Sequence, residues 1–137
     1  MRKINDILKQ CAVIEVIGDN DRLVSGLAFD SRKCTDGMAF FAIRGTQVDG
    51  HDFIAKVVEQ GTKVIVCEHI PSVMADDVTY YVVDDTAKSL GYAASEFYGR
   101  PSEKLRLVGV TGTNGKTTIA TLLYRLFFNA GYPCGLL

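Results

Sequence analysis

The stretch from residue 105 to residue 130 constrains the fold most, because an apolar run, a glycine-rich loop and a helical pattern follow one another there. The apolar run at residues 105–110 predicts a strand, and residues 116–130 predict a helix. The helix would carry a wide apolar face made of Ile119, Leu122, Leu123, Leu126, Phe127 and Ala130. Such a helix normally lies on a parallel sheet, so the segment indicates an α/β fold.

The loop between these two elements reads Gly112-Thr113-Asn114-Gly115-Lys116-Thr117-Thr118. Glycines let a backbone curl around a phosphate group, and a helix N-terminus offers free N–H groups and a positive dipole end. Lys116 could then reach the β- and γ-phosphates, and the Thr117 hydroxyl could ligate Mg²⁺. We therefore predict an ATP site with magnesium at residues 112–118.

This loop departs from the general pattern G-x-x-x-x-G-K-[ST] at its first position. Val110 stands where the pattern has glycine, and the nearest glycines are Gly109 and Gly112. A glycine-rich turn with a solvated Lys116 is the alternative interpretation. The predicted strand before the loop and the predicted helix after it favour phosphate binding.

The rest of the chain alternates between strand-like and helix-like patterns and contains no repeat. Strands are predicted at residues 13–16, 24–30, 38–43, 64–67 and 80–83. Helices are predicted at residues 3–11, from 49–50 to a left-handed Gly61, and at 86–99 with Thr86 near the cap. Polar and turn-forming residues gather at 99–103. This predicts a boundary between a domain at 1–103 and a second at 104–137.

Composition argues against several classes of protein. The net charge is −1 and there is no basic run, so we expect no nucleic-acid or membrane surface. Lys3 and Asp6 interrupt the N-terminal apolar residues, which argues against a secretion signal. The four cysteines are widely spaced, as expected for free thiols in a reducing compartment. We expect a cytoplasmic protein, with the monomer as its simplest state.

Several segments together resemble the Mur ligases, in particular the MurE type. The loop and its flanks read Leu107-Val-Gly-Val-Thr-Gly-Thr-Asn-Gly-Lys-Thr-Thr118. The N-terminal matches, in family order and spacing, are Phe29-Asp-Ser-Arg32, Asp36-Gly-Met-Ala-Phe-Phe-Ala42, Gly45-Thr-Gln-Val-Asp-Gly-His51 and Tyr98-Gly-Arg-Pro-Ser-Glu-Lys-Leu105. The resemblance covers essentially the whole chain, so it implies a small substrate-binding α/β domain followed by the start of a P-loop ATPase domain.

The resemblance also implies a reaction and a set of contacts. Family members use ATP to phosphorylate the carboxylate of a UDP-N-acetylmuramoyl peptide, and an amino acid then attacks the acyl phosphate. Phe29 and Ser31 would line the uridine pocket. Thr46, Gln47 and Val48 would contact the nucleotide and its diphosphate, although many relatives carry histidine at the position of Thr46. Without the family, residues 30–32 would be interpreted as a local turn.

The resemblance further implies that the chain is a fragment, because Leu137 falls where the second strand of the ATPase sheet should begin. The modified lysine, the further magnesium ligands and the domain that selects the amino acid would lie beyond it. Lys116 is thus the only catalytic candidate here, and we expect no ligase activity from residues 1–137 alone. The third amino acid cannot be read from this sequence.

Two other functions stay open at this point. A MurF-type or folylpolyglutamate-type ligase would share a similar loop, although MurF sequences usually carry serine where Thr113-Asn114 stands. A stand-alone nucleotide-binding module is the non-catalytic alternative. His51 and His69 show no carboxylate or metal partner in the sequence pattern, and we assign them no role.

Overall fold

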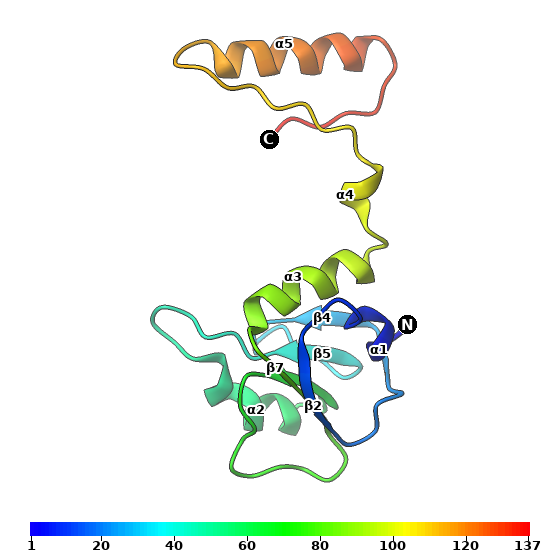
Figure 1. Ribbon diagram of the computed structural model, residues 1–137, viewed down its shortest axis with the longest axis vertical. Helices are drawn as coiled ribbons and strands as arrows, with labels where there is room; N and C mark the ends of the chain where they lie inside the picture. The colour runs from blue at the N-terminus through cyan, green and yellow to red at the C-terminus, as the bar shows by residue number, and fades with distance from the viewer. The chain divides into compact units, whose positions relative to one another are not determined.

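The computed structural model describes all 137 residues and divides them into two compact units, Met1–Glu103 and Lys104–Leu137. A short helix, α4 (Pro101–Lys104), lies at the boundary between them (Figure 1).

The first unit is built on a five-stranded sheet. Its strands lie in the order β2 (Val13–Ile17), β7 (Thr79–Val83), β6 (Val64–Cys67), β5 (Met38–Phe41) and β4 (Gly26–Ala28). β4, β5, β6 and β7 are parallel, and β2 pairs antiparallel with β7 at one edge. Because parallel strands are buried on both faces, every residue of β6 and β7 is buried, and all of them except Thr79 are hydrophobic.

Helices cover both faces of this sheet (Figure 1). Successive side chains of a strand point to opposite faces, so Phe41 and Tyr81 pack with α1 (Ile4–Ile7) and α3 (Thr86–Phe97). Their neighbours Phe40 and Tyr80 pack on the other face with α2 (Ile54–Glu59). A 3₁₀ turn, η1 (Gly50–Phe53), leads into α2. The result is three layers, helix on sheet on helix.

Most of the predicted elements of this unit form, with shifted ends. The expected strand at 24–30 is divided, because β3 (Leu23–Val24) pairs with β1 (Arg2–Lys3) while β4 pairs with β5. The expected helix at 3–11 shortens to α1, since the chain turns after Leu8 toward the edge strand β2. Asp85, and not Thr86, caps α3 by accepting a hydrogen bond from the Lys88 N–H.

The second unit contains the expected long helix, α5 (Lys116–Asn129), preceded by the glycine loop. The predicted strand at residues 105–110 was wrong, because no strand forms there and Leu107 is 88% exposed. A strand requires a neighbour to complete its ladder of hydrogen bonds, and residues 104–137 contain no other strand. The apolar face of α5 is likewise exposed at Ile119, Leu122 and Leu126.

No helix in the structure combines the length and apolar character needed to cross a bilayer. All four cysteines are free thiols; Cys34 and Cys67 are buried and Cys134 is exposed.

Candidate functional site

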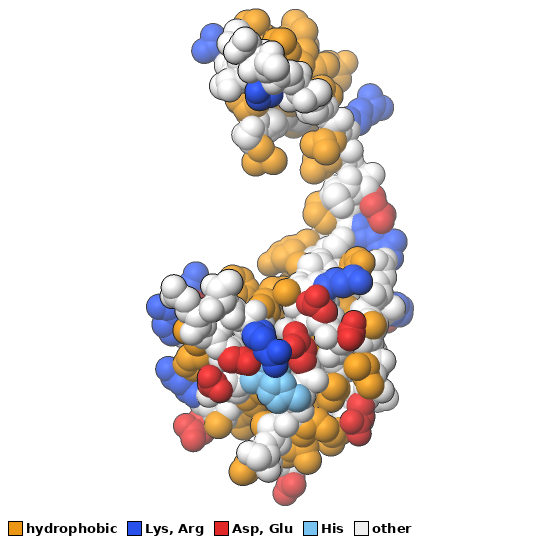
Figure 2. All heavy atoms as spheres, turned by 60° about the vertical axis from the view of Figure 1, so that its left-hand side comes forward, with side chains coloured by type: hydrophobic (Ala, Val, Ile, Leu, Met, Phe, Trp, Pro, Cys, Tyr) orange, Lys and Arg blue, Asp and Glu red, His pale blue; other side chains and the backbone are white.

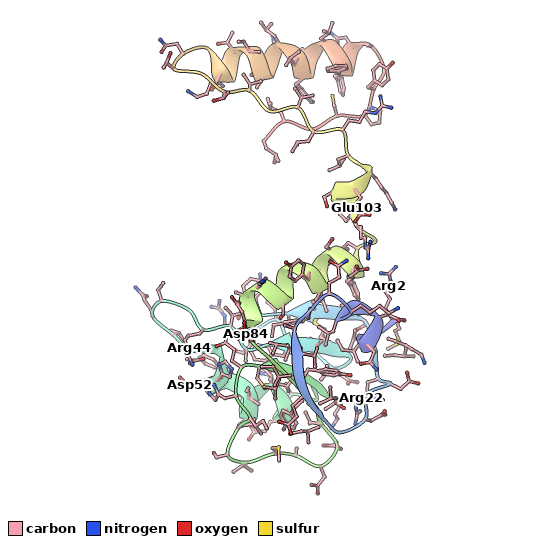
Figure 3. The ribbon with its side chains drawn as sticks, in the orientation of Figure 1. Arg2, Arg22, Arg44, Asp52, Asp84 and Glu103 are labelled. Carbon is pink, nitrogen blue, oxygen red and sulfur yellow. The ribbon has the colours of Figure 1, made fainter.

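The carboxyl ends of the four parallel strands of the first unit bring polar residues to one edge of the sheet. Residues 29–32 follow β4, a longer loop follows β5, Glu68 follows β6, and Asp84 follows β7. In Figure 3 the labels of Arg44, Asp52 and Asp84 lie on the side of the first unit from which these loops leave. In open α/β sheets, ligands bind outside the carboxyl ends of the strands, so this edge is the candidate binding site.

The first predicted contact segment forms a tight turn after β4. The Asp30 carboxylate accepts from the Arg32 backbone N–H at 3.0 Å, from its Nε at 2.9 Å and from its Nη2 at 2.8 Å. Phe29 is 64% exposed, whereas Ser31 is only 8% exposed. The turn therefore presents an aromatic ring to solvent beside a shielded hydroxyl.

The second predicted contact segment is the tip of a loop that follows the neighbouring strand β5. Arg44 and Asp49 pair as an isolated antiparallel bridge, the Gly45 N–H bonds to the Val48 carbonyl at 2.9 Å, and the Gly50 N–H bonds to the Ile43 carbonyl at 2.8 Å. Thr46, Gln47 and Val48 at the tip are exposed. Because β4 and β5 are adjacent and parallel, this loop and the Phe29 turn begin at the same edge of the sheet.

His51 has partners that the sequence pattern did not reveal, so the expectation of an isolated histidine was wrong. Its Nδ1 lies 2.6 Å from Asp49 Oδ1, and its Nε2 accepts a hydrogen bond from the Glu68 backbone N–H at 2.9 Å. The His69 ring stacks on it with 4.0 Å between ring centroids. The spacing Asp49-x-His51 was the available signal for the first contact. Nothing in the sequence indicated Glu68, which is 17 residues away.

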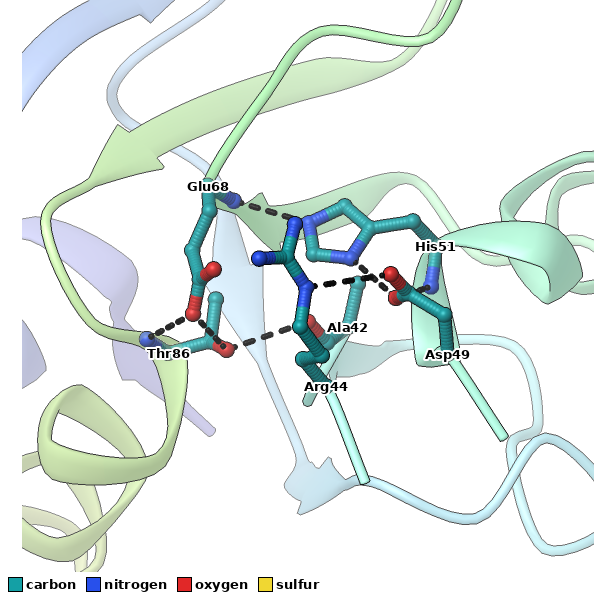
Figure 4. A network of polar contacts seen from close by, with 6 residues as sticks. All are labelled: Ala42, Arg44, Asp49, His51, Glu68 and Thr86. Atoms are coloured by element: carbon teal, nitrogen blue, oxygen red, sulfur yellow. Dashed lines mark hydrogen bonds and ion pairs between the residues drawn. The ribbon is translucent and has the colours of Figure 1, made fainter. Parts of the chain in front are cut away.

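Glu68 and Thr86 extend this set of contacts to the start of α3 (Figure 4). Glu68 Oε1 accepts from the Thr86 backbone N–H at 3.2 Å. The Thr86 hydroxyl lies 3.0 Å from both that carboxylate oxygen and the Ala42 carbonyl oxygen, and it can donate its single proton to one of them at a time. Figure 2 shows histidine side-chain atoms at the surface, next to acidic side chains and a basic one.

Asp49 stabilises the loop in a pH-dependent way. Hydrogen bonds from the His51 backbone N–H and from the His51 ring lower the pKa of Asp49 from 3.8 to about 2. Because the pKa is depressed in the folded state, the stabilisation is complete above about pH 4 and is lost as the pH falls toward 2. We expect the stability difference between the wild type and Asp49→Asn to shrink over this range, measured by urea unfolding.

Asp52→Asn is the matched control for this experiment, because Asp52 is exposed and makes no ion pair in the structure. Its difference from the wild type should change little over the same range. An Asp49→Asn difference that stayed constant between about pH 4 and pH 2 would contradict the assignment.

The glycine loop of the second unit has a backbone that suits an anion. Gly115 is the N-cap of α5 with φ +77°, in the left-handed region that favours glycine, and Gly112 has φ +147°. Lys116 Nζ lies 2.5 Å from the Gly112 carbonyl oxygen, so the cation folds back over the loop. The backbone N–H groups at the start of the 14-residue helix α5 have no helical partners of their own.

These features fit a nucleoside triphosphate with its magnesium ion. The helix start supplies N–H donors, Lys116 supplies a positive charge within reach of the loop, and Thr117 supplies a hydroxyl in the first turn. Of the predicted residues, 112–118 are thus contiguous in one unit, whereas Phe29, Ser31 and residues 46–48 belong to two loops that leave adjacent parallel strands at the same sheet edge of the other. No group of His, Cys, Asp and Glu side chains forms a metal site of its own.

The chain is similar in sequence to a known protein family. Residues 23–98 match the family model described as "Mur ligase family, catalytic domain". UDP-N-acetylmuramoyl-L-alanyl-D-glutamate–2,6-diaminopimelate ligases from Phocaeicola vulgatus and Cytophaga hutchinsonii are each 50% identical to the chain over 98% of its length. The chain spans 28% of the length of each of these relatives.

Solved structures with the same arrangement include two MurF enzymes. A MurF crystal structure from Acinetobacter baumannii gives a TM-score of 0.63 at 26% identity, covering 93% of this chain and 26% of that one. MurF ligase from Thermotoga maritima, solved in complex with ADP, gives a TM-score of 0.53 at 31% identity, covering 79% of this chain and 23% of that one.

Proposed function

The chain belongs to the Mur ligase family, and from that premise we propose that it is part of an ATP-dependent ligase that extends UDP-N-acetylmuramoyl-L-alanyl-D-glutamate by a third amino acid. The observation that supports the proposal is that the Phe29 turn and the loop carrying residues 46–48 both begin at the carboxyl edge of adjacent parallel strands. This edge would hold the uridine nucleotide part of the substrate.

The roles at this edge follow from the chemistry of the side chains. Phe29 would offer an exposed aromatic face to the uracil ring, and Ser31, which is only 8% exposed in the free chain, would offer its hydroxyl to the edge of the base. The loop that carries Thr46, Gln47 and Val48 would contact the ribose and diphosphate, where Gly45 leaves its backbone accessible.

The glycine loop would hold the second substrate, ATP. Residues Gly112, Thr113, Asn114, Gly115, Lys116, Thr117 and Thr118 would surround its phosphates, with Mg²⁺ on the Thr117 hydroxyl. ATP supplies the γ-phosphoryl group that converts the substrate carboxylate to an acyl phosphate, releasing ADP; the amine then displaces phosphate as the amide forms. Lys116 would neutralise charge on the transferring group.

The sequence relatives favour the MurE type over the MurF type, because the diaminopimelate ligases reach 50% identity and the MurF structures only 25–31%. The relatives are named for 2,6-diaminopimelate, which is therefore the first amino acid to test. We place the enzyme in the cytoplasm, where ATP is available, and we propose that it acts as a monomer.

Phe29→Ala tests the uridine site directly. Loss of an aromatic contact with the base should lower the affinity for UDP-N-acetylmuramoyl-L-alanyl-D-glutamate by about tenfold in calorimetric titration. The side chain is 64% exposed, so the thermal unfolding midpoint should stay close to that of the wild type.

Tyr98→Ala is the matched control, because this aromatic side chain is 71% exposed and lies at the C-cap of α3, away from the strand ends. It should bind the nucleotide as the wild type does. Equal affinity of Phe29→Ala and Tyr98→Ala would remove Phe29 from the site.

A further inference from the structure

The tip of the loop after β5 has few contacts of its own, so its position depends on its base. Residues 45–48 are all exposed, and within the loop only the hydrogen bond from the Gly45 N–H to the Val48 carbonyl closes the tip. At the base, Asp49 pairs with Arg44 and its carboxylate accepts two hydrogen bonds from His51, at 2.9 Å from the backbone and 2.6 Å from the ring. The contacts of Asp49, together with the hydrogen bond from the Gly50 N–H to the Ile43 carbonyl, therefore set the direction of the tip.

The His51 ring has one possible tautomer in this arrangement. A backbone N–H can only donate, so Nε2, which faces the Glu68 N–H at 2.9 Å, must carry a lone pair. The proton of the neutral ring is then on Nδ1, where it is donated to the Asp49 carboxylate. The His51 side chain is 5% exposed and the stacked His69 ring covers one of its faces.

The far side of the ring is fixed to the sheet itself. The Glu68 backbone continues directly from β6, and its carboxylate binds the backbone N–H of Thr86, the first residue of α3. Thr86 is fully buried, and its hydroxyl also reaches the carbonyl of Ala42, which follows β5. The ends of three neighbouring strands thus meet in one connected set of hydrogen bonds (Figure 4).

We propose that His51 is a positioning residue that aligns the 45–48 loop with the nucleotide by joining Asp49 to the backbone of Glu68. This inference rests on the proposed function of that loop. This role requires no contact between His51 and the nucleotide. Because the end of β6 is fixed in the sheet, the hydrogen bonds through His51 hold the loop in a defined position. The loop then loses less conformational entropy when the nucleotide binds.

The ligand-free chain supplies the first test. Nitrogen-15 NMR of the His51 ring should show a protonated Nδ1 and an unprotonated Nε2, and the Glu68 amide should be protected from hydrogen exchange. The opposite tautomer would overturn the proposal, because Nε2–H cannot accept from the Glu68 N–H. This measurement needs no ligand, so it decides on the hydrogen-bond connection even if the proposed function fails.

Two conservative variants supply the second test. His51→Asn can keep the donor to Asp49 and loses the acceptor for the Glu68 N–H, whereas His51→Gln can keep that acceptor and loses the donor. Each lost hydrogen bond should lower the affinity for UDP-N-acetylmuramoyl-L-alanyl-D-glutamate by about tenfold. The amides of residues 45–48 should exchange faster in both variants, while those of β6 and β7 stay protected.

The matched control is His69→Gln, which removes the stacked ring and leaves every hydrogen bond of the set in place. Its affinity should stay within about twofold of the wild type. Wild-type affinity in a folded His51→Asn or His51→Gln would overturn the proposal, as would loss of the fold in both, since His51 would then be a general stability element. A wild-type chain that binds no uridine nucleotide would count against the proposed function, and the ring tautomer would be unaffected by that result.

Discussion

Lys116→Ala should lower ATP turnover by about 10²–10³-fold, the effect of removing one preorganised charge-stabilising group from an active site. The ammonium group lies over the glycine loop, 2.5 Å from the Gly112 carbonyl oxygen, at the N-terminal end of α5. From this position the ammonium group can leave the Gly112 carbonyl and contact the β- and γ-phosphates of ATP. The measurement is ADP release under saturating substrates by the complete protein that the open reading frame encodes.

Arg125→Ala is the matched control for this prediction. It removes a positive charge from the same helix, on an exposed residue nine positions further along α5, so nonspecific electrostatic attraction of ATP falls by the same amount. Its turnover should stay within about threefold of the wild type. Undiminished turnover by Lys116→Ala would show that the glycine loop does not bind the triphosphate, and the proposed enzymology would fail with it.

Gly50→Ala should destabilise the first unit by about 3 kcal/mol or more, at the upper end of the cost of overpacking. A Cβ at this position would lie 2.6 Å from the Ile43 carbonyl oxygen and 2.7 Å from the Ile43 nitrogen. Both are backbone atoms at the base of the loop after β5, so no side chain can rotate away to make room. The measurement is urea unfolding of the 137-residue chain.

Gly91→Ala is the opposite case and serves as the control. Gly91 lies within α3 and is exposed, and a Cβ at this position would meet no atom within 4 Å. Alanine there should stabilise the protein by about 0.5–1 kcal/mol, because glycine loses more backbone entropy in a helix. A free energy of unfolding of Gly50→Ala within about 1 kcal/mol of the wild-type value would mean that the base of the loop can open. It would contradict a rigid loop base next to His51.

The local pattern was sufficient for the elements that bury apolar runs. Residues 38–43 and 64–67 were predicted as strands from their apolar runs, and β5 and β6 form there. Helix α5 was likewise predictable, because its start is marked by the glycine loop and its apolar residues recur at helical spacing. The strand at 105–110 was wrong because a strand depends on a partner, and periodicity cannot supply one.

The candidate site divides in the same way. The sequence by itself was enough to predict a phosphate-binding loop, since the residues from Gly112 to Lys116 are contiguous and the glycines act locally through φ. Only the tertiary structure decided that the Phe29 turn and the 46–48 loop share one edge, and that His51 joins Asp49 to Glu68. The physical reason is that strand order and parallel pairing bring together backbone groups that are distant in sequence. Contacts with such groups produce no pattern in the local sequence.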